Sequence, residues 1–423
     1  MAAQPLRDPG ATLRGPRRAL VLSGGGARGA YEVGVLAALF EEILPELPAD
    51  FEFDVMSGTS VGAIHAAYAA ASADLPPAER ARRLVETWSE MRVRDVLRLS
   101  VGDLFGIPLR ALGLSRLRRR FKTGTQRPGE ADVVGGLVDL APLEQLVAER
   151  IPWMHLRGNL KRGRPGALCV SCTEVRTGKV TVFMDGELAD PAPWRFDPNA
   201  QAIHGRVTPE HVRASAAIPF LFPAVRISDR YYVDGGLRMN TPLSPALRLE
   251  ADRVLVIALK HAPGSSAGLP AYPEDVITQP AFLLGKVLNA LMLDQLEYEL
   301  RGIELVNSWI ERGSDVYGDD FLPQINEAVR EKRGVDYRDV SVTAIRPHED
   351  IGALAAACYE RSGRAELGVL PALLTRAALR GVPAGEADLL SYLYFDRCFT
   401  RELIALGQED TRRRRDEILE LLA

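Results

Sequence analysis

Cysteine and histidine are scarce in this chain of 423 residues, which contains four of the first and six of the second. Cys169 and Cys172 form a single C-x-x-C, and neither a second cysteine pair nor histidines at ligand spacing follow it, as the common zinc sites would require. The pair lies in an apolar stretch typical of a strand, on which positions three apart point to opposite faces. We therefore expect buried, reduced thiols, no metal site and a reducing compartment.

Long apolar runs are also absent. The best candidate, residues 281–293, is interrupted by Lys286 and Asn289 and is shorter than the roughly 20 residues of a membrane span. Near the N-terminus, arginines precede the apolar residues 19–22. That run is too short for a signal peptide, and Arg28 stands where a cleavage region would be. The sequence thus predicts a cytoplasmic protein without a signal peptide or a transmembrane helix.

An excess of positive charge is missing as well, because the formal net charge is −4. This balance gives no reason to expect a nucleic-acid partner. Residues 116–122 (RLRRRFK) form a local basic run with two apolar side chains. The run fits either a solvated charged surface or peripheral contact with an anionic membrane. Residues 412–415 (RRRR), ahead of a short amphipathic end, allow the same two interpretations.

What the sequence does contain is a repeated strand–turn–helix pattern. Residues 18–22 predict a strand, followed by a glycine turn and a helix over residues 30–42. Residues 51–56 and 61–71 repeat the arrangement. Two such units favour a parallel sheet with crossover helices. Further strands are predicted at residues 168–173, 179–183, 230–233, 253–259 and 339–345, and helices at residues 77–91 and 143–149.

A serine stands between two glycines where the second of these strands gives way to its helix, in residues 58–62 (GTSVG). In a G-x-S-x-G elbow a sharp turn lifts the serine hydroxyl above the sheet, and Gly58 and Gly62 avoid the clash that a Cβ would cause. The helix N-terminus favours the negative charge that develops during attack. The preceding strand and the following helix give the motif the context it requires. Ser60 is therefore the predicted nucleophile of an acyl-ester hydrolase.

A glycine-rich loop, residues 23–29 (SGGGARG), joins the first strand to the first helix. Successive glycines leave backbone N–H groups free to point at an anion. Gly24, Gly26 and Gly29 match G-x-G-x-x-G, so one candidate anion is a dinucleotide pyrophosphate. The other is the oxyanion of a tetrahedral intermediate. A dinucleotide site also requires an acidic residue at the end of the second strand, where the serine elbow stands instead, so the oxyanion role is favoured.

A serine hydroxyl needs a base to accept its proton. Residues 231–236 (YYVDGG) place Asp234 at the end of a predicted strand, with Gly235 and Gly236 beside it. An acid at the C-terminal end of a strand faces a crevice in an open α/β sheet. Asp-Gly is equally a common turn signal, so this segment alone leaves both interpretations open.

These segments together resemble the patatin-like phospholipases. Residues 214–219 (ASAAIP) resemble the A-S-x-A-x-P block of that family, and the four blocks stand in the family's order over roughly half of the chain. The resemblance implies a Ser–Asp dyad that works without histidine, with Ser60 as nucleophile and Asp234 as general base. It implies an oxyanion hole formed by the amides of Gly24, Gly25 and Gly26, and supporting roles for Arg28, Gly29, Gly58, Gly62, Gly235 and Gly236. Ser23 departs from the aspartate that many members carry before the glycines.

The fold implied by the resemblance is a three-layer α/β hydrolase with a mainly parallel central sheet. Residues 1–17 are expected to form a flexible lead-in, and residues 18–262 the patatin-like catalytic domain, with a helical insertion at about residues 72–164. Residues 263–423 are expected to be mainly helical, with a long amphipathic helix at residues 280–310.

The sequence allows more than one role for His261 and for Arg28. His261 follows a predicted strand and would give the order Ser–Asp–His of triad hydrolases, or it is a solvated histidine at the strand end. His65, five residues past Ser60, is expected to face away from it. Arg28 either binds a substrate phosphate as a bidentate donor or braces the glycine loop through backbone carbonyls.

The expected reaction is hydrolysis of a fatty-acyl ester of a lipid or phospholipid through an acyl-enzyme, without metal or organic cofactor. Transfer of the acyl group to another alcohol would use the same dyad. A dinucleotide-binding oxidoreductase using the glycine loop, and a lipid-binding scaffold without turnover, are the alternatives from other classes.

Overall fold

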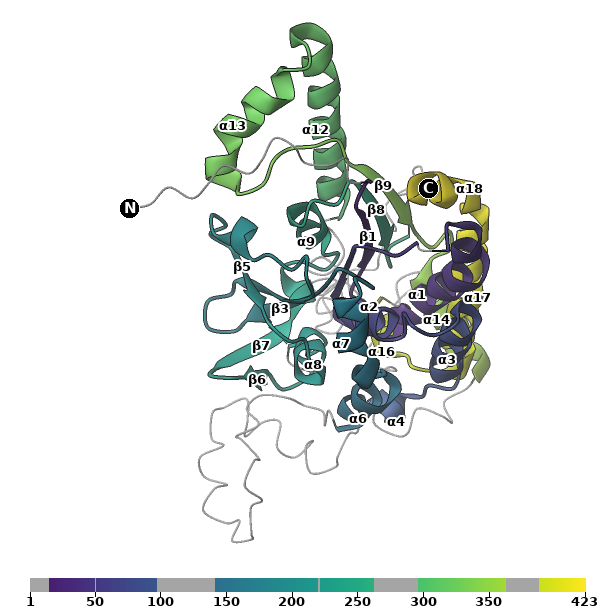
Figure 1. The fold of residues 1–423 in the computed structure, drawn as a ribbon. Coiled ribbons are helices and arrows are strands. Elements are labelled where there is room, and N and C mark those ends of the chain that lie inside the picture. Colours follow the sequence, from purple (N-terminus) through teal and green to yellow (C-terminus); the bar gives the residue numbers. More distant parts are fainter. Residues whose placement is uncertain (1–14, 50, 97–140, 220, 262–295, 363–387) are drawn as a thin grey trace, which may run out of the picture.

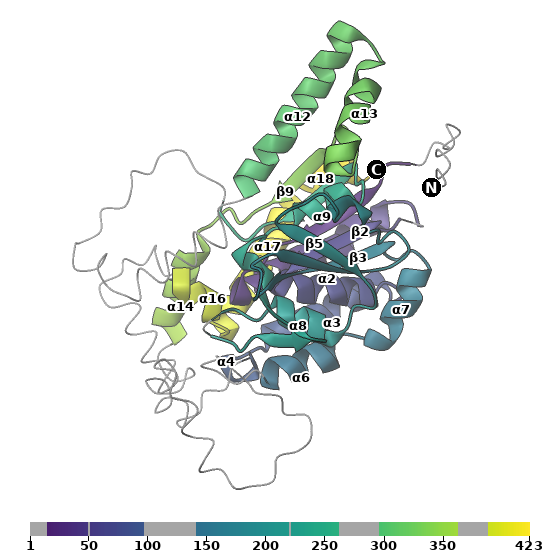
Figure 2. The ribbon, with the colours of Figure 1, turned by 90° about the vertical axis from the view of Figure 1, so that its left-hand side faces the viewer.

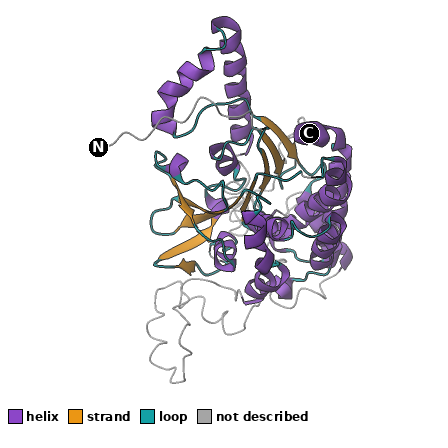
Figure 3. Cartoon of the chain, in the orientation of Figure 1, coloured by secondary structure: helices purple, strands orange, loops and turns teal. Residues whose placement is uncertain are grey.

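The computed structural model describes residues 15–49, 51–96, 141–219, 221–261, 296–362 and 388–423. Within these residues, nine strands form one sheet in the order β5-β4-β3-β2-β1-β8-β9, and β7 pairs with both β3 and β6 (Figures 1 and 3). The strands are β1 (Arg18–Leu22), β2 (Val55–Thr59), β3 (Ala167–Glu174), β4 (Val180–Asp185), β5 (Ala200–His204), β6 (Val225–Ile227), β7 (Arg230–Asp234), β8 (Arg253–Ile257) and β9 (Ser341–Ile345).

The middle of this sheet is parallel. β1 pairs in parallel with β2 and β8, β2 with β3, and β8 with β9. β1 and β2 lie between other strands, and residues 19–22 and 55–59 are buried along their whole length. Strands of a parallel sheet are commonly apolar along their length, because helices cover both faces of the sheet. The C-terminal ends of β1 and β2 meet at one edge, which brings the glycine loop beside the serine elbow.

The parallel pattern ends at β3. β4 runs antiparallel to it, and β7 pairs antiparallel with its last residues, with Cys172 opposite Asp234. β2 pairs with the same edge of β3 as β7, and there Ser171 is the partner of Thr59. Since Ser60 follows Thr59, this register carries the end of β7 to the position of the elbow.

Helices surround the sheet, and the described ones are α1 (Gly29–Ala38), α2 (Val61–Ala71), α3 (Pro77–Ser89), α4 (Val93–Val96), α6 (Ala141–Arg150), α7 (Trp153–Lys161), α8 (Pro209–Ser215), α9 (Leu243–Arg248), α12 (Leu296–Tyr317), α13 (Phe321–Arg333), α14 (Ile351–Ser362), α16 (Asp388–Leu393), α17 (Arg397–Arg413) and α18 (Arg415–Leu422). A π-helical turn, Leu39–Ile43, continues α1.

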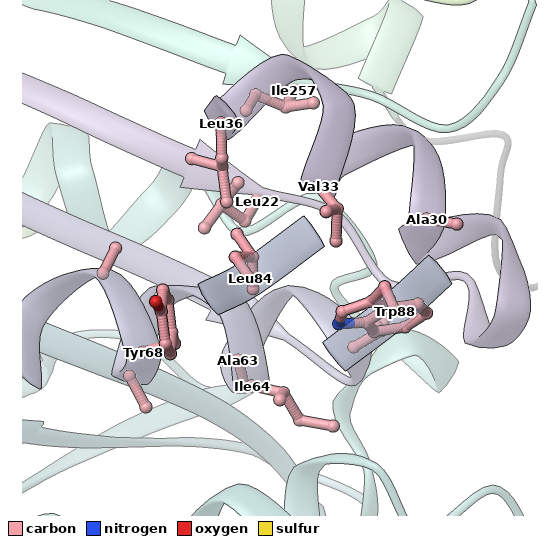
Figure 4. Packing of buried hydrophobic residues seen from close by; sticks show 14 of the residues in the cluster. Leu22, Ala30, Val33, Leu36, Ala63, Ile64, Tyr68, Leu84, Trp88 and Ile257 are labelled. Atoms are coloured by element: carbon pink, nitrogen blue, oxygen red, sulfur yellow. The ribbon is translucent and has the colours of Figure 1, made fainter. Parts of the chain in front are cut away.

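Successive side chains of the strands enter two separate cores, as the alternation of a strand requires. Leu22 and Ile257 pack with Leu36 of α1 and Leu84 of α3 in the larger core (Figure 4). Val21, one residue from Leu22, lies in the second core on the opposite face, which α9 and the start of α12 cover. The result is a helix–sheet–helix arrangement.

The C-terminal helices belong to the same body. α17 packs along α1 (Figure 1) so closely that a Cβ at Gly34 or Gly407 would collide with a backbone carbonyl of the other helix. The hydroxyl of Tyr31 on α1 donates to Asp410 Oδ2 on α17 at 3.0 Å. α12 and α13, by contrast, form a hairpin that projects from the body (Figure 2).

The predicted elements agree with the observed ones to different degrees. The helix predicted at residues 61–71 coincides with α2, and the one predicted at residues 77–91 with α3. The second strand was predicted at residues 51–56, but β2 begins at Val55 and pairs with β1 as far as Gly58. β5 and β6 were not predicted, because they are short and partly exposed.

The domain boundary at residue 262 stays a prediction, although β9 joins the sheet built by residues 18–262 and α17 shares its core. Residues 97–140 of the insertion, including the basic run at residues 116–122, and the first part of the helix predicted at residues 280–310 lie outside the described residues. In the described part of the chain, no helix combines the length and the apolar character needed to cross a bilayer.

Candidate active site

Ser60 occupies the sharp turn between β2 and α2. Its backbone has φ 55° and ψ −124°, a sparsely populated region that costs about 1–3 kcal/mol and persists where the surroundings enforce it. A Cβ at Gly58 would collide with the carbonyl of Gly62, and one at Gly62 with the carbonyl of Leu22. The two glycines of the motif therefore allow the turn to pack against β1.

Asp234 lies beside the serine, at the end of β7. The Ser60 hydroxyl donates to Asp234 Oδ2 at 2.6 Å. The amide of Gly236 donates to the other carboxylate oxygen at 2.7 Å. A Cβ at Gly235 would collide with the carbonyl of Ser171 on β3, so the Asp-Gly-Gly sequence lets the chain turn closely under the carboxylate.

Burial determines the protonation of this carboxylate. The Asp234 side chain is almost fully buried, and loss of solvation raises the pKa of Asp234 to about 7, although the hydrogen bonds from Ser60 and Gly236 act in the opposite direction. A general base works best when its pKa lies near the operating pH. The site therefore holds a hydroxyl and a carboxylate in contact, with the proton affinity that base catalysis requires.

The glycine loop runs past the same serine. A Cβ at Gly24 would collide with Asn240 and lie 3.0 Å from Ser60 Cβ. Gly26 has φ +57°, and a Cβ there would collide with the carbonyl of Tyr392. The Gly24 amide donates to the Asn240 carbonyl at 2.9 Å. Because the Gly24 amide already donates this hydrogen bond, it is not free to bind an oxyanion. Of the three predicted donors, the amides of Gly25 and Gly26 remain.

The ASAAIP segment holds both catalytic candidates in place. The Ser215 hydroxyl accepts from the Ser60 amide at 2.9 Å and donates to the Ser171 carbonyl at 2.6 Å. The Ala217 carbonyl accepts from the Asp234 amide at 2.9 Å. Ser215 thus ties the elbow to β3. The sequence predicted no role for Ser215 beyond its place in the family-like segment at residues 214–219.

The segment after the aspartate supports the glycine loop, and we did not predict this. Asn240 Nδ2 donates to the Gly24 carbonyl at 3.1 Å, while the hydroxyls of Ser23 and Thr241 lie 2.7 Å apart. Thr59, directly before the nucleophile, donates to the Met239 carbonyl at 2.9 Å. Ser23 therefore joins the glycine loop to this segment.

A sequence model described as patatin-like phospholipase matches residues 20–247, which is more than half of the chain. The chain belongs to the patatin-like phospholipase family. The predicted fold class, a patatin-like α/β architecture with a mainly parallel sheet, is confirmed. A search of curated protein sequences gave no match.

Solved structures of low sequence identity were also found. VipD from Legionella pneumophila is 16% identical over 92% of this chain and 67% of its own, with a TM-score of 0.34. Human GIVD cytosolic phospholipase A2 is 13% identical over 96% of this chain, with a TM-score of 0.43, and the match spans only 60% of the human chain. ExoU of Pseudomonas aeruginosa, solved with SpcU, is 16% identical over 96% of this chain and 79% of its own, with a TM-score of 0.26.

Arg28 of this patatin-like protein is turned toward the C-terminal helices. Its Nε donates to the Ser391 hydroxyl at 2.7 Å, and its guanidinium lies 4.2 Å from the centre of the Tyr392 ring. The side chain is buried. These contacts favour bracing over phosphate binding, although the partners found here are side chains of α16, whereas backbone carbonyls were expected.

The histidines that follow the nucleophile have other partners. His65 Nδ1 lies 2.6 Å from Glu32 Oε2, and both side chains are fully buried. Burial lowers the pKa of His65 to about 3 and raises the pKa of Glu32 well above its usual range, despite a hydrogen bond from the Ser23 backbone. His65 thus links α2, the helix that follows Ser60, to α1. This contact is compatible with the prediction that His65 faces away from Ser60. His261 Nδ1 lies 2.9 Å from the Pro347 carbonyl.

An apolar cavity opens from Ser60. Its volume is about 40 Å³, close to that of a single water molecule. Phe395 and Leu393 come from the C-terminal region, and Trp88, Ile64 and Phe222 from the family region. The remaining lining residues are Gly26, Ser60, Val61, Met91, Val96, Leu143, Leu146, Ala216, Ile218 and Tyr392.

Among the described residues, the one group of three or more cysteine, histidine or acidic side chains whose ligand atoms lie within 4.8 Å of one another comprises Cys358, Cys398 and Glu402. It includes neither Ser60 nor Asp234. Cys169 and Cys172 are buried thiols whose side chains lie in the two different cores, as expected for positions three apart on a strand.

Proposed function

We propose that this patatin-like phospholipase hydrolyses fatty-acyl esters of lipids, with Ser60 and Asp234 as a catalytic dyad. The observation that carries the proposal is the 2.6 Å hydrogen bond from the Ser60 hydroxyl, which lines an apolar cavity, to the Asp234 carboxylate. A nucleophile and its base within hydrogen-bond reach are the arrangement that covalent catalysis requires.

The proposed reaction proceeds in two stages. Asp234 accepts the hydroxyl proton while Ser60 Oγ attacks the ester carbonyl, and the amides of Gly25 and Gly26 stabilise the oxyanion. Collapse of the intermediate releases the alcohol with the proton from Asp234 and leaves an acyl-enzyme. Asp234 then deprotonates a water that attacks the acyl-enzyme, and the fatty acid departs as Ser60 regains its proton.

The lining of the cavity supports an apolar acyl group as the part of the substrate that enters. Aliphatic and aromatic side chains surround Ser60, and polar atoms contribute little to the wall. The cavity of about 40 Å³ between the described residues is smaller than a fatty-acyl chain, so binding of such a chain would require the cavity to widen. Peripheral contact with an anionic membrane remains part of the proposal, and its basic run at residues 116–122 lies outside the described residues.

A dinucleotide site is disfavoured by the packing of the glycine loop. Gly24 faces Asn240 and Ser60, Gly25 faces Leu259, and Gly26 faces the Tyr392 carbonyl. The loop is thus covered by side chains and backbone of the chain itself. Acyl transfer to another alcohol would use the same dyad, and it is distinguished by the product formed when an alcohol acceptor is added.

The proposal is tested by measuring fatty-acid release from vesicles of phosphatidylcholine, with and without phosphatidylglycerol. The wild-type protein should release fatty acid, and Ser60→Ala should release none above background. Stimulation by phosphatidylglycerol that disappears at high salt would support membrane contact through charge. Equal release by the wild-type protein and Ser60→Ala, or none by either, would contradict the proposal.

A further inference from the structure

Two cysteines outside the proposed active site lie in contact near the C-terminus. Cys358 is on α14 and is fully buried, and Cys398, in the first turn of α17, is partly exposed. Their Sγ atoms are 2.7 Å apart, closer than unbonded sulfur atoms normally approach. A disulfide bond of about 2.05 Å would require only a small further movement. Cys169 and Cys172, in contrast, lie on opposite faces of β3.

An acidic and a basic side chain lie against this pair. Glu402 lies one turn beyond Cys398 on α17, and its Oε2 is 3.2 Å from Cys358 Sγ. Arg361 of α14 lies 3.2 Å from the same sulfur and pairs with Glu402. Burial, with Cys398 and Glu402 nearby, raises the pKa of Cys358. Cys358 therefore holds its proton at neutral pH and needs a base, and Glu402 is in place to accept that proton.

We propose that Cys358 and Cys398 form a reversible thiol–disulfide exchange site for small disulfides of the glutathione type. Cys398, the more accessible sulfur, loses its proton to solvent and attacks the disulfide, which releases one thiolate and leaves a mixed disulfide on Cys398. Glu402 then takes the proton of Cys358, whose sulfur attacks Cys398 Sγ. The Cys358–Cys398 bond forms, the second thiolate departs with a proton, and the small disulfide has been reduced to two thiols.

A metal site is the competing interpretation of the same cluster. The ligand atoms of Cys358, Cys398 and Glu402 lie within 4.8 Å of one another. However, a zinc ion bound at about 2.3 Å from each sulfur would have to push the two sulfurs apart. The guanidinium of Arg361 already supplies the positive charge next to Glu402 and Cys358. The contact between the sulfurs therefore favours the disulfide.

The exchange site borders the C-terminal wall of the active-site cavity. The Cys398 amide donates to Asp396 Oδ1 at 2.9 Å, which caps α17, and Phe395, one residue earlier, lines the cavity. A bond between Cys358 and Cys398 would fix this end of the wall to α14. The proposal itself is independent of the hydrolase activity, since none of its three reacting groups contacts Ser60 or Asp234 in the described residues.

The test treats the folded, full-length protein with glutathione disulfide, quenches with acid, alkylates the remaining thiols and maps the cysteines by mass spectrometry. The wild-type protein should lose two alkylation sites, Cys358 and Cys398, and the mass of two hydrogen atoms. Cys358→Ser should stop at the mixed disulfide of glutathione with Cys398, and Cys398→Ser should form no bond. Glu402→Gln should form the same bond at least several-fold more slowly, because the base is lost. Cys169 and Cys172 serve as internal controls and should stay alkylatable.

Three outcomes would overturn the proposal. The first is that both thiols of the wild-type protein stay alkylatable. The second is that a mixed disulfide accumulates in the wild-type protein as it does in Cys358→Ser. The third is that added Zn²⁺ binds stoichiometrically and protects both thiols from glutathione disulfide, which would assign the cluster to a metal.

Discussion

The strands and the C-terminal helices contribute to the active site in different ways. Ser60 directly follows β2, Asp234 is the last residue of β7, and the glycine loop follows β1, each marked by a short local motif. α16 and α17 contribute no reacting group, yet Ser391 binds Arg28 across 363 positions of sequence, and the Tyr392 carbonyl lies against Gly26. The motifs thus define the chemistry, whereas the shape of the loop depends on residues near the other end of the chain.

The largest expected effect comes from the strand side. Asp234→Asn keeps the shape of the side chain but removes the base, so we expect kcat for ester hydrolysis to fall by roughly a hundred- to ten-thousandfold. Asp410→Asn is the matched control on the helix side, because Asp410 is also buried and bonded to Tyr31 and His348. This control should lower stability and affect kcat far less. A similar loss of kcat in both variants would remove the distinction between the two regions.

The pH dependence follows from the same carboxylate. With its pKa raised to about 7, Asp234 is a competent base only above that pH, so log kcat/KM should rise up to about pH 7 and then level off.

The raised pKa stabilises the fold below the unfolded value of about 3.9, and this contribution is lost as pH rises through about 7. The thermal stability of Asp234→Asn relative to the wild-type protein should therefore increase between about pH 4 and about pH 7. If kcat/KM of the wild-type protein and the stability difference between the two proteins did not change with pH across this range, the assignment of Asp234 as the base would be contradicted.

The next effect lies where the two regions touch. In Gly26→Ala the new Cβ would collide with the Tyr392 carbonyl, and the residue would keep a φ of +57° that alanine rarely adopts. Displacing a proposed oxyanion donor should lower kcat by about a hundred- to a thousandfold. Gly205→Ala is the control, since its Cβ would meet nothing within 4 Å. Circular dichroism verifies the fold, and a folded Gly26→Ala protein with native kcat would show that the loop shape is not critical.

A smaller effect is expected at Ser215, which bonds the elbow to β3. Ser215→Ala should cost about 1–3 kcal/mol of stability because the Ser60 amide loses its partner. A shifted nucleophile should also lower kcat by roughly ten- to a hundredfold. Ser72→Ala removes a comparable buried hydrogen bond, to the Tyr68 carbonyl at the far end of α2, and should lower stability alone. Denaturant unfolding and ester hydrolysis, measured on both variants, separate positioning from simple stability.

The smallest effect is expected at His261. If the dyad needs no imidazole, His261→Ala should keep kcat within roughly twofold of the wild-type value. Initial rates on a soluble ester provide the check. A loss comparable to that of Ser60→Ala would replace the dyad by a triad.

The sequence was sufficient for those parts of the site that depend on neighbouring residues. The G-x-S-x-G pattern specifies a strand, a turn and a helix within a few positions, so α2 and the sharp turn at Ser60 could be predicted. Asp234 could be placed at a strand end, but the segment alone did not distinguish a base from a turn residue. The pairing of Cys172 with Asp234, a long-range register, brings the carboxylate to the serine.

Contacts between distant segments could not be predicted. The hydroxyl of Ser215 meets the Ser60 amide because β3 and α8 lie beside the elbow, and no periodicity records that arrangement. The same is true of Arg28: its motif allows phosphate binding as well as bracing, and its contacts with Ser391 and Tyr392 come from a distant segment. The three-residue strand β6 is too short for its pattern to stand out from a turn.

The most direct test of the central claim is labelling with a lipid-like fluorophosphonate, followed by mass-spectrometric location of the adduct. The hydrogen-bonded pair of Ser60 and Asp234 predicts one adduct on Ser60 in the folded wild-type protein, strongly slowed labelling of Asp234→Asn and no labelling of Ser60→Ala. An adduct on another residue, or a folded protein that hydrolyses lipid esters while Ser60 stays unmodified, would contradict the account.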